Sequence, residues 1–316
     1  MRAANLFFLV FLTGCFSESP KPSVFKMSYN TGLVNTASLS QDGNFSVVSN
    51  HNEICVWNNK ERDKVYPCVS DTNASFVELS GISANNQYFY LSNRLSVSLY
   101  RLSDGKFVNQ WTTDPNVIND IAISRDGMVL ILGYRNGETS TIDVVKNTLK
   151  NYKLHELDVN SVAVSGDGKL AFTGSSDKKA ILWQTATGEV QSSFKHRSRV
   201  NHVDINEAGN LAISLDAIKD RFIWDLSNKS SQIELDTNLK FLEFNDSSFL
   251  ASKAYLLTGS PNRKIHLWST DTGELVKQWI SHKEENRDRA SVLAVSFYGD
   301  QIAAITSDGV FELYKM

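Results

Sequence analysis

Acid–base chemistry and metal binding near neutral pH fall mainly to histidine, and the chain contains six histidines. The most enzyme-like trio is His155, Asp177 and Trp183. His266 lies within the apolar run IHLW, which is more typical of a packed core residue than of a ligand. The HExxH, CxxC, P-loop and GxSxG patterns are absent from the sequence. Because no acid, base and nucleophile are fixed relative to one another, we expect no catalytic site, cofactor or metal.

Composition argues against several classes of protein. The chain has 316 residues and a formal net charge of −3, without the clustered lysine and arginine that nucleic-acid binding requires. Three cysteines are too few for a disulfide-rich miniprotein, and five prolines argue against long disordered tracts. The length is sufficient for one large all-β domain.

Two members of the trio lie in Val159–Val190, which combines several short strands and tight turns in one unit. VNSVAVS, KLAFTGS and AILWQ have the alternating and β-branched residues of strands, and EVQSSF is a fourth candidate. The intervening GDG, SDK and TATG segments contain the residues that tight turns require. Four such strands form a small twisted sheet that cannot bury its two faces alone.

Repetition of this unit along the chain supplies the neighbours. The turns SRDG, SGDG and NEAG end at Gly127, Gly168 and Gly209, which are 41 residues apart, and SQDG ends at Gly43. Seven third strands recur along the chain: ICVW, VSLY, TSTI, AILW, FIWD, IHLW and FELY. We therefore predict an all-β, seven-bladed β-propeller whose four-stranded antiparallel blades each contain about 40 residues.

The two ends of the chain complete this ring. The C-terminal FELYKM is a third strand, so the last blade lacks its outer strand. Residues Ser23–Tyr29 alternate apolar and polar side chains and have no partner of their own. We predict that they pair beside Phe311–Lys315 and close the ring, which removes an open sheet edge. The propeller domain would then span residues 23–316.

A unit with SxDG, then LAxTGSxD, then IxW resembles the WD-repeat family of propellers, over about Val24–Met316. In that family, a tetrad of His, Ser/Thr, Asp and Trp is hydrogen-bonded and ties the loop before the first strand to the third strand. The resemblance places this structural tetrad at His155, Thr173, Asp177 and Trp183. It therefore implies that the enzyme-like trio is the internal brace of a blade.

The following unit matches the family pattern less completely. His196, Ser214 and Trp224 stand at the family spacing. The turn LDAIKD is expected to be longer than the pattern, which leaves either Asp216 or Asp220 as the acidic partner.

The N-terminus has the features of an export signal. Arg2 precedes the apolar run AANLFFLVFLT, which is short for a membrane span and fits a signal peptide. The LTGC that follows resembles the lipobox of bacterial lipoproteins. The resemblance implies that residues 1–14 are removed, that Cys15 is lipidated with acyl chains such as palmitate, and that residues 15–22 form a tether.

The residue after the lipobox bears on location. Phe16 stands where an Asp would resemble an inner-membrane retention signal, so the resemblance implies an outer-membrane anchor facing the periplasm. Two alternatives stay open: an ordinary signal peptide that contains a cysteine, and a cytoplasmic propeller with a chance hydrophobic start.

The other two cysteines would then lie in an oxidising compartment. Cys55 and Cys68 are equally far from the turn centre between Glu61 and Arg62, which places them opposite each other on a hairpin. We predict a structural disulfide that stiffens one blade. The alternative is a pair of free buried thiols.

One rim of the disk carries the loops between blades and the turns between second and third strands. In the WD-repeat family this rim commonly binds protein partners. The basic residues predicted to lie there are Arg94, Arg135, Lys178, Lys179, Arg197, Arg199, Arg287 and Arg289. Arginine is enriched at interface hot spots, although a solvated loop charge is the simpler interpretation of any single one.

Together these patterns favour a monomeric, non-catalytic propeller, anchored through Cys15, that scaffolds or recognises another protein of the bacterial envelope. The alternative is a propeller enzyme or small-ligand sensor that uses the central channel. Three or more His, Asp or Glu side chains converging within hydrogen-bonding reach in the channel would favour the enzyme. A scattered set would favour the scaffold.

Overall fold

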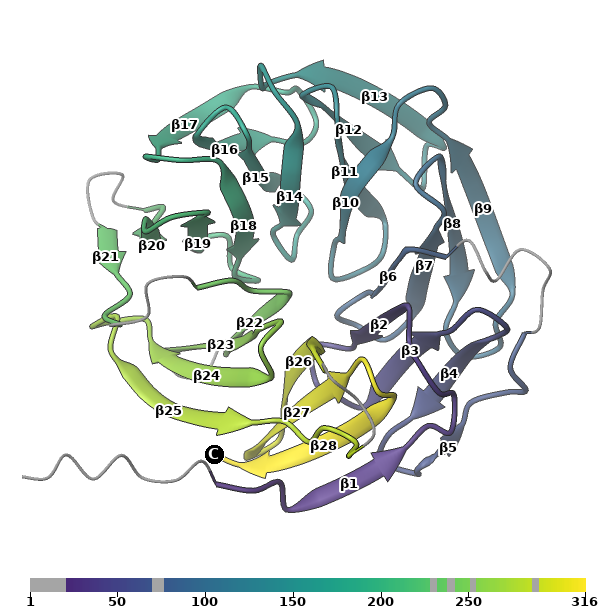
Figure 1. Cartoon of the computed structure of the whole chain (residues 1–316). Helices are drawn as coiled ribbons and strands as arrows, with labels where there is room; N and C mark the ends of the chain where they lie inside the picture. Colours follow the sequence, from purple (N-terminus) through teal and green to yellow (C-terminus); the bar gives the residue numbers. More distant parts are fainter. Residues whose placement is uncertain (1–20, 70–76, 228–231, 238–241, 251–253, 286–289) are drawn as a thin grey trace, which may run out of the picture.

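The computed structural model describes residues 21–69, 77–227, 232–237, 242–250, 254–285 and 290–316. These residues form 28 β-strands in seven four-stranded antiparallel sheets, arranged as blades in a ring (Figure 1). The seven-bladed all-β propeller predicted from the repeat is confirmed. Within the described ranges, no helix is long and apolar enough to cross a membrane.

The blades follow one another in chain order, and the first strand of each lies innermost (Figure 1). The first three blades are β2–β5 (Thr36–Leu39, Phe45–Ser49, Ile54–Asn58, Asp63–Lys64), β6–β9 (Leu79–Ile82, Tyr88–Ser92, Ser96–Arg101, Phe107–Thr112) and β10–β13 (Ile118–Ile123, Val129–Tyr134, Glu138–Asp143, Thr148–Lys153). The next three are β14–β17 (Val159–Val164, Leu170–Ser175, Lys179–Gln184, Val190–Lys195), β18–β21 (Val200–Ile205, Leu211–Asp216, Arg221–Asp225, Gln232–Glu234) and β22–β25 (Asp246–Leu250, Tyr255–Gly259, Lys264–Ser269, Leu275–Ile280).

The seventh blade joins the two ends of the chain. Three of its strands are β26 (Val292–Tyr298), β27 (Gln301–Thr306) and β28 (Val310–Lys315). Its outer strand is β1 (Phe25–Ser28), which pairs antiparallel to β28 in the register Phe25–Leu313 to Ser28–Val310. This is the predicted closure of the ring, and it leaves β28 covered instead of exposed as an open edge.

The SxDG motif builds the turn between the first and second strands. The Ser165 hydroxyl donates to Asp167 Oδ1 at 2.8 Å and accepts the Leu170 N–H at 3.0 Å. Gly168 supplies the positive φ of 71° that the turn requires. The same side-chain bond recurs at Ser40–Asp42, Ser83–Asn85 and Ser124–Asp126. In the first four blades the motif therefore repeats because each needs the same hydrogen-bonded turn.

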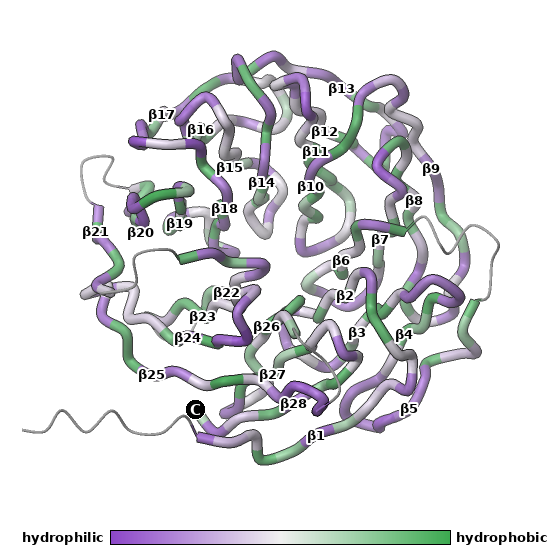
Figure 2. Tube along the Cα trace, viewed as in Figure 1, coloured by the Kyte–Doolittle hydropathy of each residue, from purple (hydrophilic) through white to green (hydrophobic). Residues whose placement is uncertain are grey.

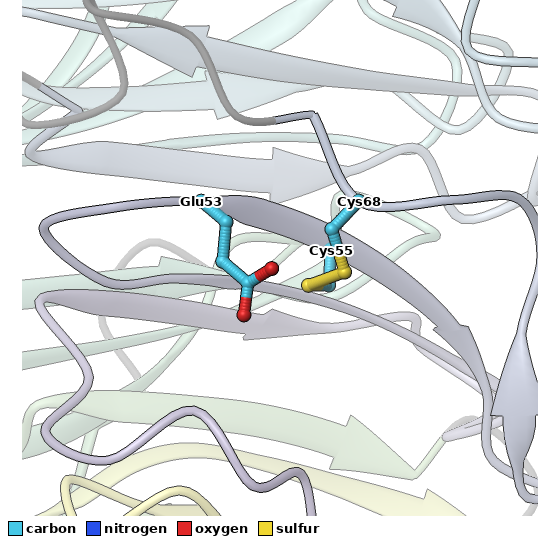
Figure 3. Close-up of side chains that lie close together, drawn as sticks. All are labelled: Glu53, Cys55 and Cys68. Carbon is cyan, nitrogen blue, oxygen red and sulfur yellow. A yellow bond between two sulfur atoms is a disulfide. The ribbon is translucent and has the colours of Figure 1, made fainter.

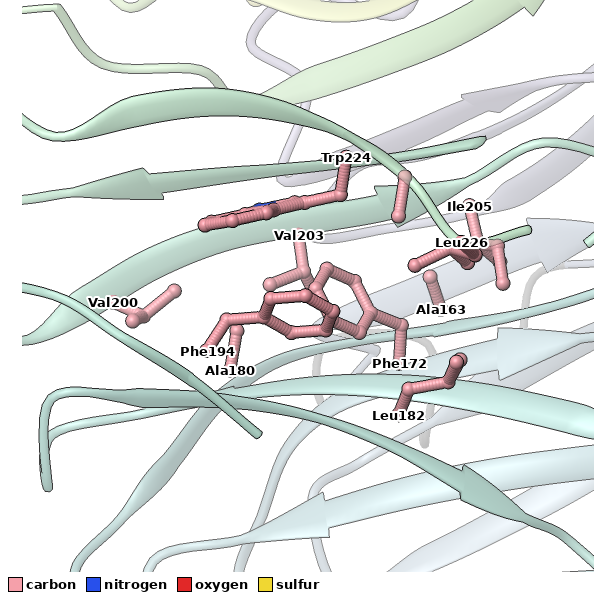
Figure 4. Close-up of a cluster of buried hydrophobic side chains, with 11 residues drawn as sticks. Ala163, Phe172, Ala180, Leu182, Phe194, Val200, Val203, Ile205, Trp224 and Leu226 are labelled. Atoms are coloured by element: carbon pink, nitrogen blue, oxygen red, sulfur yellow. The ribbon is translucent and has the colours of Figure 1, made fainter. Parts of the chain in front are cut away.

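The hydrophobic core is divided among the junctions between blades. Buried apolar side chains of the described residues form seven clusters, each containing residues of two neighbouring blades. Between the fourth and fifth blades, the Phe194 ring lies 5.8 Å from that of Phe172 and 4.4 Å from that of Trp224 (Figure 4). Hydrophobic segments follow the strands, and many of the turns are hydrophilic (Figure 2). A single blade therefore cannot bury its faces without its neighbours.

One expectation about turn length was wrong. The turn LDAIKD was expected to be longer than its counterpart in the preceding blade. The pairs Gly174–Ala180 and Leu215–Arg221 enclose turns of equal length, since each pair is separated by six positions. The two turns differ in where their acidic residues stand and not in length.

Candidate functional site

The predicted rim is one continuous face of the disk. The turns between second and third strands contact the loops that connect successive blades, as the N–H of His196 donates to the Lys178 carbonyl at 2.9 Å. The rim positions that the structure describes belong to blades two to five and their connecting loops: Arg94, Arg135, Lys178, Lys179, Arg197 and Arg199. Arg287 and Arg289 lie outside the described residues.

Three of the rim cations are paired with carboxylates. Arg94 contacts Glu78 and donates to the Ile118 carbonyl at 3.3 Å. Lys179 Nζ lies 3.1 Å from Glu156 Oε1. In the loop that enters the fifth blade, Arg197 Nε lies 3.3 Å from Asp220 Oδ1. These cations are partly neutralised by the protein itself.

The other three rim cations have no such partner. Arg135 donates to the neutral amide oxygen of Asn119 at 3.1 Å. Lys178 and Arg199 are exposed, and Lys178 adopts a positive φ of 69° at the tip of its turn. In the described part of the chain, no carboxylate lies within the 4.0 Å ion-pair distance of Arg135, Lys178 or Arg199. Blades three to five therefore present positive charge that is available to a partner.

The fourth blade contains most of the predicted tetrad. His155 Nε2 lies 2.9 Å from Thr173 Oγ1, and His155 Nδ1 lies 3.0 Å from Asp177 Oδ2. Burial opposes ionisation of Asp177, but its hydrogen bond with His155 and the charge of that ring hold its pKa below the usual range. The Trp183 indole N–H is buried and has no partner among the described residues. The Thr173 hydroxyl instead donates to the Ile181 carbonyl at 3.4 Å, so the hydrogen-bonded chain does not include the indole, and Trp183 contributes packing.

In the fifth and sixth blades, unlike the fourth, the indole N–H of the third-strand tryptophan donates to a Ser or Thr hydroxyl. Trp224 Nε1 donates to Ser214 Oγ at 2.6 Å, and that hydroxyl also lies 2.9 Å from His196 Nε2. In the sixth blade, Trp268 Nε1 donates to Thr258 Oγ1 at 3.0 Å. The histidines of the tetrad are therefore engaged in bracing their blades.

The central channel contains a polar cavity of about 340 Å³ that we did not predict. Its lining includes Asp120, His202, Asp204, Asp246 and Ser247 from the innermost strands β10, β18 and β22. A sequence signal for it exists in INDI, VNSV, VNHV and FNDS, in each of which an Asn is followed by a second polar residue, at about the blade spacing.

The repeated pair of Asn and a polar residue forms hydrogen bonds to the backbone of the next blade. Three of the Asn side chains donate to a backbone carbonyl of the next blade at 2.8–2.9 Å: Asn119 to Val159, Asn160 to Val200 and Asn245 to Val292. The residue after each Asn accepts a backbone N–H from the next blade. These bonds are Asp120 with Val162 (2.8 Å), Ser161 with Val203 (3.2 Å) and Asp246 with Val295 (2.8 Å). The polar channel lining therefore ties neighbouring blades together.

A short hydrogen-bonded relay crosses the channel wall. His202 Nε2 lies 2.8 Å from Ser247 Oγ, and that hydroxyl donates to Asp204 Oδ2 at 2.9 Å. Burial lowers the pKa of His202 to about 4. It raises the pKa of Asp204 to about 7, despite the hydrogen bond from Ser247. A neutral, weakly basic imidazole is a poor base for activating a serine hydroxyl.

The other two channel acids are also hard to ionise. Burial raises the pKa of Asp246 to about 7 and that of Asp120 to about 6, although both accept backbone hydrogen bonds. Across the described ranges, the channel holds no three His, Asp, Glu or Cys ligand atoms within 4.8 Å of one another. The described channel acids are therefore spread along the innermost strands and do not converge on one point.

The first blade contains a disulfide between Cys55 of β4 and Cys68, with Cα atoms 4.5 Å apart (Figure 3). Next to it, Ile54 and Val69 exchange backbone hydrogen bonds of 3.0 and 2.9 Å. The fourth strand of this blade, β5, has only two residues. The disulfide and the Ile54–Val69 bridge continue the contact between β4 and the outer segment beyond β5. Glu53 lies close to the two sulfurs (Figure 3), but the disulfide consumes both thiolates that a metal would need.

The sequence profile of the family described as WD40, WD domain, G-beta repeat, matches residues 146–184. This match and the seven-bladed fold together support the WD-repeat family of propellers. The matched stretch includes the brace residues His155, Thr173, Asp177 and Trp183. WD-repeat propellers commonly mediate protein–protein interactions and generally act as non-enzymatic scaffolds. No curated protein matches the chain.

Proposed function

We propose that this protein is a non-catalytic, lipid-anchored recognition module of the bacterial envelope that binds an acidic segment of another protein. The observation that carries the proposal is the positive charge left without carboxylate partners on one rim, at Arg135, Lys178 and Arg199. These residues are contributed by adjacent blades, so a single partner could contact all of them. Rim charges of this kind steer association and set specificity.

The anchoring part of the proposal rests on the sequence. Cys15 and its lipobox-like context lie outside the described residues. The first described residue, Lys21, forms a parallel bridge with Trp279 of β25. A tether of residues 15–22 would therefore leave the disk beside the outer edge of the sixth blade, and this would leave the rim open to a partner in the periplasm.

Reversing the rim charge is expected to weaken partner binding by about 10- to 100-fold, since three attractive charges become repulsive. The variant is Arg135→Glu, Lys178→Glu and Arg199→Glu combined. Partners would be identified by crosslinking in the intact envelope, and the affinity of the purified pair would be measured at low and at physiological salt.

A charge-matched control separates this effect from a general change in net charge. Lys60→Glu, Lys106→Glu and Lys146→Glu combined reverse three charges in turns between third and fourth strands, on the opposite rim. The control should retain the partner. Equal affinity of the rim variant and the control would refute the rim as the binding face.

Cys15→Ser is expected to move the protein from the membrane fraction to the soluble fraction, because the thiol that carries the acyl chains is lost. Ser17→Ala is the matched control and should stay in the membrane fraction. The readout is separation of inner-membrane, outer-membrane and soluble fractions. An unchanged distribution of Cys15→Ser would rule out lipid anchoring through this residue.

A small-ligand sensor is the second candidate function. It is favoured by one observation, the cavity of about 340 Å³ with its His202–Ser247–Asp204 relay. Cavities of this size hold small polar molecules. If Ser247→Val left partner binding unchanged but abolished binding of a small molecule from a metabolite screen, the channel would have a role of its own.

A further inference from the structure

On the rim of the fifth blade, one histidine and two aspartates converge. His196 lies in the loop between β17 and β18, Asp216 ends β19, and Asp220 directly precedes β20. One ligand atom of each lies within 4.8 Å of the other two. The three residues are only 7%, 2% and 5% exposed, respectively. Such burial is unusual for two carboxylates that face each other.

The cluster contains a buried polar atom with no partner. His196 Nε2 is occupied by Ser214 at 2.9 Å, but His196 Nδ1 has no hydrogen-bond partner among the described residues. In the preceding blade, the corresponding atom of His155 lies 3.0 Å from Asp177. The fifth blade thus has two carboxylates where the fourth has one, but neither carboxylate is hydrogen-bonded to the histidine Nδ1.

Backbone hydrogen bonds hold both carboxylates in place. Asp216 Oδ1 accepts the N–H groups of Ile218, Lys219 and Asp220 at 2.7–2.9 Å, and its Oδ2 accepts the Ser198 N–H at 2.9 Å. These contacts fix the first carboxylate in one orientation.

Asp220 is held by the loop that carries His196. Its Oδ2 accepts the Arg197 N–H at 2.8 Å, and its Oδ1 lies 3.3 Å from Arg197 Nε. Among the described residues, Arg197 is the one cation within ion-pair distance of either carboxylate, and its partner is Asp220. Burial lowers the pKa of His196, although the charges of the two aspartates oppose this.

We propose that His196 Nδ1 and the carboxylates of Asp216 and Asp220 form a binding site for a divalent transition-metal ion, with Zn²⁺ the best match. One imidazole nitrogen with two carboxylate oxygens is a donor set that zinc accepts. Zinc–ligand bonds of about 2.0–2.2 Å place tetrahedral ligand atoms about 3.4 Å apart. Each of the three ligand atoms would therefore move toward the ion by about 1 Å at most on binding.

The ion would do in this blade what the His155–Asp177 bond does in the preceding one. It would tie the loop before the first strand to the turn between the second and third strands. Three protein ligands leave a fourth position open, as in zinc sites that take water or an incoming ligand. The site lies next to Arg197, which contacts Asp220 and is one of the rim cations. The metal site itself does not depend on the proposed function.

The test uses the full chain, purified without a histidine tag and without reductant, stripped with a chelator and titrated with Zn²⁺ alone. Calorimetry and elemental analysis should give one zinc per chain. The unfolding midpoint should rise by about 5 °C when free zinc is 100-fold above Kd. Asp220→Asn and His196→Gln should each lose stoichiometric zinc and the midpoint rise.

His155→Gln is the matched control, because it removes the corresponding brace histidine from the fourth blade and leaves the cluster intact. It should retain one zinc per chain. If His196→Gln does not fold, the isosteric Asp216→Asn and Asp220→Asn still decide the question, with folding checked by circular dichroism. Less than stoichiometric zinc in the unmodified chain would overturn the proposal, and so would zinc retention by both Asp→Asn variants.

Discussion

Deletion of residues 23–29 is expected to lower the free energy of unfolding by about 5 kcal/mol or more, a large fraction of the stability of a typical domain. The deletion removes β1, which supplies the outer strand of the last blade and joins the two ends of the ring. β28 would then have an open edge, and the junction between the seventh and first blades would lose part of its core.

Tyr29 accounts for much of this effect. It is 2% exposed, and its ring lies 5.0 Å from that of Trp57 in the first blade and 6.4 Å from that of Phe311 in the seventh. Its hydroxyl lies 2.8 Å from Ser46 Oγ and donates to Asn59 Oδ1 at 3.0 Å. One side chain therefore connects the last blade to the first through both packing and hydrogen bonds.

Graded variants test this explanation by chemical denaturation. Tyr29→Ala should cost about 3–5 kcal/mol because it leaves a large cavity. Tyr29→Phe should cost about 1–2 kcal/mol because it removes only the hydroxyl bonds. A chain that begins at residue 23 is the control and should unfold like the full chain. A single cooperative transition at the original midpoint after deletion of 23–29 would argue against closure by β1.

Replacing two channel carboxylates is expected to stabilise the protein at alkaline pH. Burial raises the pKa values of Asp204 and Asp246 to about 7, against an ordinary value of 3.8. Between about pH 4 and 7 the folded protein holds protons that the unfolded chain has released, so these groups make stability fall as the pH rises. Asparagine cannot ionise and can still accept the hydrogen bonds from Ser247 and Val295, so Asp204→Asn with Asp246→Asn removes that loss.

The expected gain at pH 8 is about 2 kcal/mol for the double variant. Each shift of about three pKa units corresponds to at most about 4 kcal/mol, and the two shifts do not add, because the charges of neighbouring acids contribute to both. The unfolding midpoint should rise by about 4 °C at pH 8.

The difference between the double variant and the unmodified protein should shrink as the pH falls and vanish only below about pH 3, where these carboxyls are protonated in both the folded and the unfolded chain. His202 and His266 make the free energy of unfolding depend on pH in the opposite direction. Subtracting the midpoint of the unmodified protein from that of the double variant cancels their contribution. Burial lowers the pKa of each of these histidines to about 4. The exposed Asp300→Asn serves as the control. A midpoint difference that stays constant from pH 4 to 8 would contradict the assigned pKa shifts.

The sequence alone determined the architecture, because each feature of a blade depends on residues close together in the chain. The SxDG turn is a contact between Ser165, Asp167 and Leu170, and it recurs at the blade spacing. The period of the repeat predicted seven blades, and the unpaired Ser23–Tyr29 predicted the closure. The hydrophobic faces needed only a neighbouring blade, which the next repeat supplies.

The polar sites were decided by the tertiary structure, because their members lie far apart in the sequence. Asp204 and Ser247 meet in the channel although 43 positions separate them. Tertiary packing also gave Asp204 its raised pKa, since burial depends on the whole ring. The sequence placed His155 and His196 at equivalent tetrad positions. Only the structure shows that one has an acidic partner for Nδ1, whereas the other faces two carboxylates with that nitrogen unpaired.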